Sequence, residues 1–129
     1  MPNKRRSINE GGAMSTDALK TLVTRAIWRA ERLEEERTGS ASLAWAEISS
    51  LEEQLASALP ASQVEGRIAR RGAVRAALKA RDYARALALT QCYLADEDAP
   101  QALRAALREM LAEEPVESTD LFRLTRPTA

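Results

Sequence analysis

The sequence predicts an all-α fold: a small helical bundle in which a long antiparallel helical hairpin is followed by about three shorter helices. Three observations lead to this prediction. Apolar residues recur at spacings of three and four over most of the chain, which places them on one side of successive helices. No segment shows the strict alternation of polar and apolar residues that a half-buried strand requires. Only 5 of the 129 residues are glycine, and prolines separate the periodic segments.

The first helix is expected to run from Asp17 to the turn at residues 38–40. Ser15, Thr16 or Asp17 can cap its start, and Gly39 is expected to end it. Its apolar residues fall on one side, which should face the core. That side consists of Leu19, Leu22, Val23, Ala26, Ile27, Ala30 and Leu33.

The second helix is expected from about residue 40 to residue 59. Its apolar residues step alternately by three and four, a spacing typical of helices that pack lengthwise against a neighbour. Because only Thr38, Gly39 and Ser40 separate it from the first helix, the two helices are expected to lie antiparallel. The repeating positions are Ala41, Ala44, Ile48, Leu51, Leu55 and Ala58.

A third helix is predicted over residues 63–80. Pro60 ends the second helix, and Ser62 and Glu65 have the spacing of a capping box. The stretch from residue 79 to residue 87 resembles the turn and second helix of a tetratricopeptide hairpin. Such repeats are stable only when several copies stack, and this chain has no second copy. The resemblance therefore predicts a local helical hairpin and assigns no family.

Two further helices complete the predicted bundle. Asp82 can cap a fourth helix, which ends at the acidic residues 96–98. Pro100 suits the first turn of a fifth helix, and Pro115 ends it. The core side of the fourth helix is expected to carry Tyr83, Ala86, Leu87, Thr90 and Leu94, and that of the fifth Leu103, Ala106, Leu107, Met110 and Leu111.

The chain is expected to form one helical domain, over residues 15–114, between two flexible ends. Residues 1–14 form a basic N-terminal arm, and residues 115–129 form a polar tail with the short apolar motif Leu121–Leu124. The basic start is not followed by an apolar stretch, so a secretory signal is not expected. No apolar run approaches the roughly 18–20 residues needed to span a bilayer. We expect a cytoplasmic protein.

The composition argues against most catalytic chemistry. The chain has no histidine and a single cysteine, which removes His-based triads, Cys–His dyads and most metal sites. We therefore expect no enzymatic activity and no cofactor. The acidic runs at residues 34–36 and 52–53 are interpreted as solvated helix faces. Cys92 is interpreted as a small buried or half-buried apolar residue.

The first candidate site surrounds Trp28, which lies opposite the apolar side of the first helix. A tryptophan flanked by Arg25 and Arg32 has the composition of a protein-interface hot spot. Phe122 in the tail is a further candidate for binding a partner. The alternative is that Trp28 is covered by the fifth helix or by the tail. Trp45, beside the apolar seam of the second helix, is expected in the core.

The second candidate site is a basic row on the third helix, formed by Arg67, Arg71, Arg75 and Lys79. These residues repeat every fourth position, in a segment (residues 66–88) with seven bases and one acid, although the whole chain has a net charge of zero. The opposite face, with Gly66, Ala69, Ala73, Ala76, Ala77 and Ala80, and with Gly72 at its margin, is expected to pack inward. The basic row, interleaved with Val64, Ile68, Val74 and Leu78, is then expected to lie at an edge or to point outward.

Three interpretations of the basic row remain open. The arginines can pair with acidic residues of neighbouring helices in the same chain. They can dock an acidic protein or a second copy of this chain. They can also follow the phosphates of a nucleic acid, although the near-neutral charge and the lack of a stacking aromatic argue against this.

We expect a non-catalytic helical subunit that mediates protein–protein interaction or assembly, as an adaptor or a self-associating component of a larger complex. The alternative is a small subunit of a nucleoprotein complex that contacts phosphates through the basic row. No membrane partner is expected, because no helix combines a bulky apolar face with a basic one.

Overall fold

The computed structural model describes residues 14–113 and confirms the all-α prediction. This part of the chain forms five helices and no strand. Residues 1–13 of the arm, the tail and the apolar motif with Phe122 lie outside the described residues. The helices are α2 (Thr16–Glu35), α3 (Ser40–Ala58), α4 (Val64–Lys79), α5 (Tyr83–Leu94) and α6 (Gln101–Ala112).

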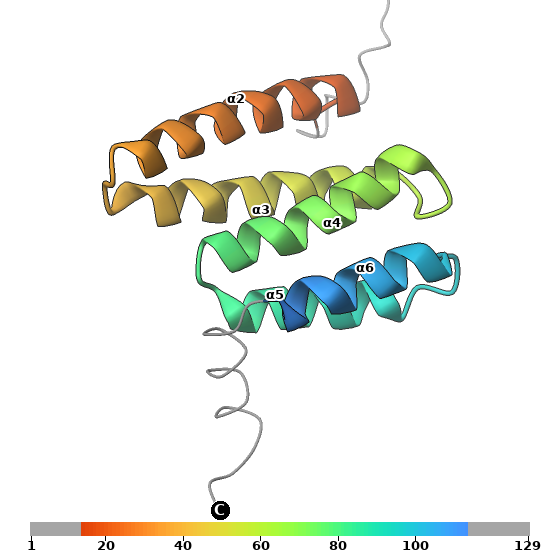
Figure 1. Cartoon of the computed structure of the whole chain (residues 1–129). Helices are drawn as coiled ribbons and strands as arrows, with labels where there is room; N and C mark the ends of the chain where they lie inside the picture. Colours follow the sequence, from red (N-terminus) through yellow and green to blue (C-terminus); the bar gives the residue numbers. More distant parts are fainter. Residues whose placement is uncertain (1–13, 114–129) are drawn as a thin grey trace, which may run out of the picture.

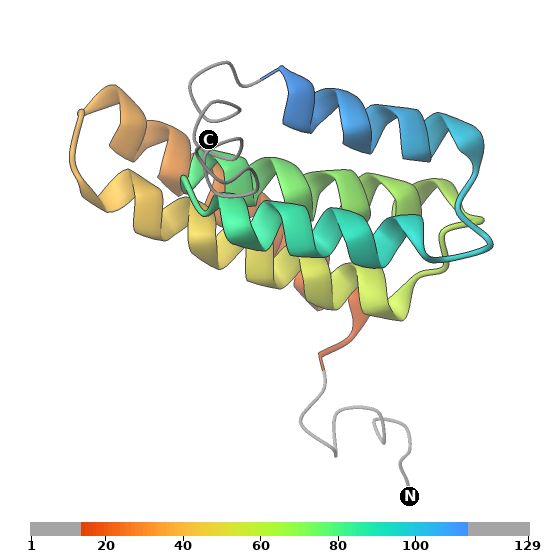
Figure 2. The same cartoon turned by 90° about the horizontal axis from the view of Figure 1, so that it is seen from below.

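The helices are stacked in chain order, as Figure 1 shows, with α2 at one end, α5 and α6 at the other, and α3 and α4 between them. The predicted antiparallel hairpin is formed by α2 and α3. Helix α4 packs against α3, α5 and α6, whereas the backbone of α2 approaches that of α3 alone. Seen from below, α5 and α6 run along different sides of α4 (Figure 2). Helix α4 is therefore the centre of the molecule and α2 is its edge.

Small residues allow α4 to hold this central place. Gly66, Ala69, Ala73 and Ala77 are buried, as predicted, together with the margin residue Gly72. A Cβ atom at residue 66 would lie 2.0 Å from the carbonyl oxygen of Pro60, so the chain between α3 and α4 can pass this closely only over a glycine. The small-residue face thus fixes how closely α4 approaches its neighbours.

The predicted edge position of the basic row is only half correct for the apolar residues that interleave with it. Val64 and Ile68 are exposed as expected, but Val74 and Leu78 are buried. These two residues belong to the same core cluster as Leu103 and other residues of α5 and α6. The prediction was wrong there because α4 packs on several sides, so that no single inward face describes it.

The helix starts confirm two of the predicted caps and contradict a third. The side chain of Ser15 accepts a hydrogen bond from the amide of Ala18, and Asp82 accepts one from Arg85. The predicted capping box is absent: α4 begins after Gln63 with no side-chain cap. Glu65 instead pairs with Lys20 of α2, at 2.8 Å.

Two helix boundaries also differ from the prediction. Helix α2 ends before Gly39, because Arg37 adopts the left-handed conformation (φ 56°) and the amide of Thr38 bonds back to Leu33. This is the Schellman arrangement, with arginine in the place where glycine is common. Gly39 has φ −67° and precedes α3. Pro100 is the residue before α6, not part of its first turn.

Candidate interaction surfaces and polar hollows

The outer face of α2 carries an exposed tryptophan. Trp28 is 66% exposed, and Arg25 and Arg32 beside it are also exposed. The interpretation that the fifth helix covers Trp28 is wrong, because α6 packs against α4 and α5 and does not approach α2. Leu121–Leu124 lies outside the described residues. The structure thus brings the three helical residues of this candidate site together on one open face.

The arginines of this face differ in whether they have an acidic partner in the chain. Arg29 lies 3.9 Å from Glu47 of α3, whereas Arg25 and Arg32 form no ion pair or hydrogen bond with any residue between 14 and 113. A hollow of about 210 Å³ opens between α2 and α3 on the Arg25 side of the face. It is lined by Leu22, Arg25, Ala26, Arg29, Glu47 and Leu51.

Trp45 is buried, as predicted, and its surroundings explain why. Its indole Nε1 donates a hydrogen bond to the exposed side chain of Glu34 at 2.7 Å, so the polar end of the buried ring has a partner. The ammonium of Lys79 lies 4.9 Å from the ring centroid. The same ammonium lies 3.9 Å from Glu34.

The basic row is divided by these contacts. At one end, Arg67 donates to the carbonyl oxygens of Ala61 and Ser62, at 3.2 and 2.9 Å. At the other end, Lys79 contacts Trp45 and Glu34, as described above. The two middle residues, Arg71 and Arg75, make no hydrogen bond or close ion pair within the described part of the chain. Pairing within the chain therefore accounts for the two ends of the row. It does not account for Arg71 and Arg75 in the middle of the row.

Three arginines outside the predicted sites hold much of the polar structure. Arg70 is buried and donates to the carbonyl oxygens of Leu59 and Gly66. Arg85 connects α5 to α3, and Arg104 connects α6 to the loop before it. A signal for Arg70 was present in the sequence: it lies four residues after Gly66 and three before Ala73, on the buried face of α4.

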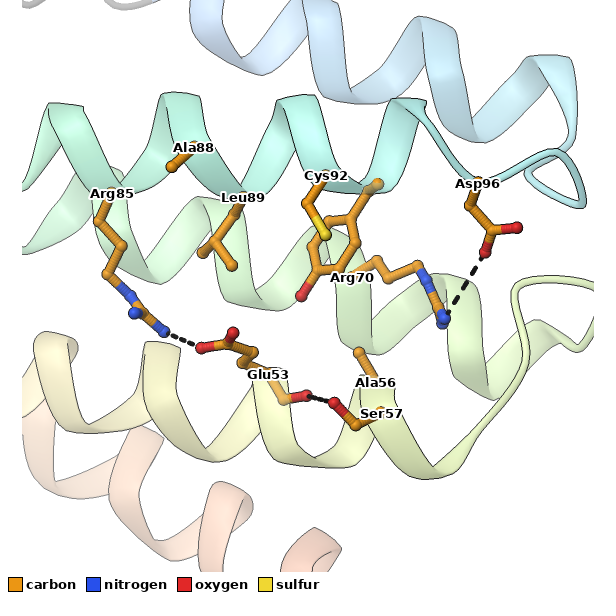
Figure 3. Close-up of a pocket in the computed structure, with 10 residues that line it drawn as sticks. Glu53, Ala56, Ser57, Arg70, Arg85, Ala88, Leu89, Cys92 and Asp96 are labelled. Carbon is orange, nitrogen blue, oxygen red and sulfur yellow. Dashed lines mark hydrogen bonds and ion pairs between the residues drawn. The ribbon is translucent and has the colours of Figure 1, made fainter.

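A hollow of about 450 Å³, bordered by two ion pairs, lies between α3 and α5. Figure 3 shows Glu53 and Arg85 facing each other across it, and Arg70 directed toward Asp96. The first pair is 2.6 Å apart and the second 4.0 Å. Because each acid faces an arginine, the hollow has no excess charge that would select a ligand.

Two residues bordering this hollow differ from what the sequence suggested. Cys92 is exposed, so its interpretation as a buried or half-buried apolar residue is wrong. Tyr93, next to it, is buried with its ring 5.5 Å from the guanidinium of Arg70, and its hydroxyl has no hydrogen-bond partner. Burial raises the pKa of Tyr93 to about 12.

A second polar feature lies on the other side of α3, where α2 and α4 face each other without direct backbone contact. We call this groove the α2/α4 trough. It contains two hollows, of about 370 and 230 Å³, and both are bordered by Ile27 and Glu52. Ion pairs bridge its walls near both ends: Lys20 with Glu65 at 2.8 Å, and Lys79 with Glu34 at 3.9 Å.

Glu52 lies on the floor of the α2/α4 trough and is only 8% exposed. Burial raises the pKa of Glu52 to about 7, and the positive charge of Arg75 opposes this shift. Its interpretation as part of a solvated face is therefore wrong. Glu52 lies four residues after Ile48 and three before Leu55, both buried, and this spacing was the signal that sequence reasoning missed.

A glycine makes room for this carboxyl group. A Cβ atom at Gly72 of α4 would lie 2.2 Å from the Oε2 atom of Glu52. Neither carboxyl oxygen accepts a hydrogen bond from a residue in the described range. The trough thus holds a largely buried acid that pairs with no described side chain and whose carboxyl oxygens open onto the hollow.

Neither metal binding nor membrane insertion is indicated for the described residues. Residues 14–113 contain no group of three or more Cys, Asp or Glu side chains placed to hold a metal ion. Within the same range, no helix is both long enough and apolar enough to cross a bilayer. Comparison of the chain with protein-family models finds no match, and searches among curated proteins and among solved structures find none either.

Proposed function

We propose that this protein is a non-catalytic, cytoplasmic interaction subunit that docks an acidic protein through the outer face of α2. The observation that supports the proposal is the exposure of Trp28 on a helix that packs on one side only. Tryptophan and arginine are the residue types most enriched at the energetic centres of protein interfaces. A chain with two tryptophans in 129 residues exposes one of them here.

The charge of this face favours an acidic partner over a second copy of the chain. Arg25 and Arg32 flank Trp28 and have no acidic partner among the described residues. An antiparallel two-fold contact between two such faces would bring the arginines of one copy against those of the other, which is unfavourable. The exposed acids Glu31 and Glu35 lie on the other side of Trp28. An acidic surface would instead pair with both, and an apolar side chain of the partner would fit the hollow beside Arg25.

The alternative of a nucleoprotein subunit rests on the middle of the basic row. Arg67 and Lys79 already have partners within the chain, which leaves Arg71 and Arg75 for phosphates. Two phosphate contacts give weak binding with a shallow salt dependence. The observations therefore favour the protein partner.

The proposal is tested by isolating proteins that bind the immobilised chain and by measuring their affinities. The full chain is immobilised, proteins retained from an extract of its native cell are purified, and the affinity of each is measured at two salt concentrations. We expect Trp28→Ala to weaken binding by about 30-fold or more. Higher salt and the double change Arg25→Glu/Arg32→Glu should also weaken it. Val64→Ala, at another exposed apolar side chain, is the matched control and should bind normally.

Three results would contradict the proposal. The first is a retained protein whose affinity is the same for the natural chain and for Trp28→Ala. The second is a solution mass above 14.2 kDa that Trp28→Ala restores to the monomer, which would show self-association instead. The third is micromolar, salt-dependent binding of oligonucleotides that is lost on Arg71→Glu/Arg75→Glu, which would favour the nucleoprotein alternative. Circular dichroism of each variant checks that the fold is intact.

A further inference from the structure

The α2/α4 trough contains an acid that the interaction surface does not use. Glu52 is buried on α3, and its carboxyl oxygens accept no hydrogen bond from residues 14–113. These oxygens are not among the side-chain atoms that are shut off from solvent without a partner, so the carboxyl group opens onto the hollow, where a ligand can reach it. Gly72 gives the carboxyl group its present position, because a Cβ atom at residue 72 would lie 2.2 Å from its Oε2 atom.

Of the acids that line the larger hollow, Glu52 is the one that no cation of the described residues pairs with. From α2, Lys20 and Glu31 face the trough, and from α4, Glu65, Arg75 and Lys79 face it. Lys20 is paired with Glu65, and Lys79 with Glu34. Arg75 acts on Glu52 through its charge but forms no ion pair within 4.0 Å, and its side chain is exposed. No cation of the described chain therefore contacts the carboxylate.

The walls around this acid are apolar. The larger hollow, of about 370 Å³, is bordered by Val23, Ile27, Leu55, Ile68 and Ala69 in addition to Glu52. Ile68, at the edge of this hollow, is 49% exposed and adds apolar surface to its rim. A hollow of this size is within the range of small-ligand sites, which are mostly apolar with few polar groups that fix orientation.

We propose that the α2/α4 trough binds a small organic cation, an ammonium group carried on an apolar body. The ammonium pairs with the carboxylate of Glu52, and the apolar body covers Ile27 and Ile68. An anion would be repelled by Glu52, and a neutral apolar molecule would leave the carboxylate unpaired and desolvated. This site is separate from the outer face of α2, so a failure of either proposal leaves the other unaffected.

The probe for the test is 2-phenylethylamine, and its neutral counterpart is 2-phenylethanol. Binding to the full chain is followed by NMR chemical shifts of backbone amides at about pH 8, where Glu52 is mainly ionised. We expect saturable binding of the amine in the millimolar range, with the largest shifts at Ile27, Glu52 and Ile68. The alcohol should bind at least about tenfold more weakly.

Variants of α3 separate the proposed role of Glu52 from a general effect of charge. Glu52→Gln should weaken amine binding about tenfold or more, whereas Glu53→Gln, on the α5 side of the same helix, should leave it unchanged. Gly72→Ala should also weaken binding, because its Cβ displaces the carboxylate. Acidification to about pH 5.5 should weaken binding by the natural chain and not by Glu52→Gln.

Several outcomes would overturn the proposal. They are the absence of saturable amine binding at millimolar concentration, equal affinity for the alcohol, and equal affinity of Glu52→Gln. Circular dichroism checks that each variant is folded. If Glu52→Gln does not fold, the decision rests on the pH dependence of binding by the natural chain and on Gly72→Ala, and unchanged binding in both would overturn the proposal.

Discussion

Two adjacent glutamates of α3 show how strongly the environment of a residue depends on the packing of the helix. Glu53 faces α5 and pairs with Arg85 at 2.6 Å. Glu52 faces the α2/α4 trough, where it is buried and no described residue donates a hydrogen bond to it. A helix that packs on two sides places consecutive residues in two different interfaces, so identical side chains acquire different chemistry.

The buried acid makes stability depend on pH. The pKa of Glu52 is about 7 in the folded chain and near the ordinary 4.5 when unfolded. Between these values the folded state binds more protons than the unfolded state, so stability falls as pH rises from about 4.5 to 7. We expect this group to lower the unfolding free energy by about 2–3 kcal/mol across that range. Urea denaturation at several pH values measures the loss.

Glu52→Gln should remove most of this pH dependence and should raise stability at pH values above about 7. Glu53→Gln is the matched control, because it changes the neighbouring acid without touching the trough. The interpretation fails if the natural chain and Glu52→Gln lose the same stability between the two ends of the pH range.

Residue environments were predictable from the sequence only where one face of a helix decides them. The exposure of Trp28 and the burial of Trp45 follow from the angular position of each relative to the apolar side of its helix. Glu52 and Arg70 were missed because their residue types suggest solvent. Their spacing from buried neighbours such as Ile48 and Ala73 was the better guide.

At the scale of helices, arginine side chains hold the connections together. The guanidinium of Arg104 donates to the carbonyl oxygens of Leu94, Asp96 and Ala99, at 2.7, 2.8 and 3.0 Å. Five N–H donors in a fixed plane allow one side chain to satisfy several carbonyls at once. The connection from α5 to α6 is therefore held in place by hydrogen bonds from Arg104, a residue of α6.

Arg104→Lys should loosen this connection, because an ammonium cannot reach all three carbonyls from one position. We expect the unfolding free energy to fall by about 1–3 kcal/mol, as when buried hydrogen bonds lose a partner. The midpoint of urea denaturation measures the change. Arg108→Lys, at an exposed position of the same helix, should have little effect, and equal midpoints for the two variants would contradict the role assigned to Arg104.

The helices themselves were largely predictable, whereas their ends were not. Periodicity and the caps Ser15 and Asp82 place the helices correctly. The capping box failed because Glu65 is engaged by Lys20, a residue 45 positions away. The end of α2 was misplaced because Arg37 adopts a conformation usually left to glycine. Both errors come from interactions or strain that local sequence preferences do not contain.

At the scale of the molecule, the helices are unequally held. Helix α4 contacts three neighbours, whereas the backbone of α2 approaches only α3. The antiparallel hairpin was predictable from the short turn between α2 and α3, but the central position of α4 was not. That position depends on close approach over Gly66 and the alanines, which a pattern of small residues suggests without naming the neighbouring helices.

This inequality predicts a gradient of local stability. Amide hydrogens of α2 should exchange with solvent by local opening, whereas those of α4 should exchange only when the whole domain unfolds. Native-state hydrogen exchange at increasing urea concentration distinguishes the two modes. Equal exchange free energies for α2 and α4 would show that the edge helix is held as firmly as the centre.

The two ion pairs that bridge the trough connect the edge helix α2 to the central helix α4. Lys20, Glu34, Glu65 and Lys79 are all partly exposed, and salt weakens exposed pairs over a Debye length of about 8 Å at physiological ionic strength. The apolar contacts between α3 and α4 do not share this sensitivity. We therefore expect ionic strength to adjust the width of the gap between α2 and α4, because the electrolyte sets how strongly the two ion pairs hold the helices together.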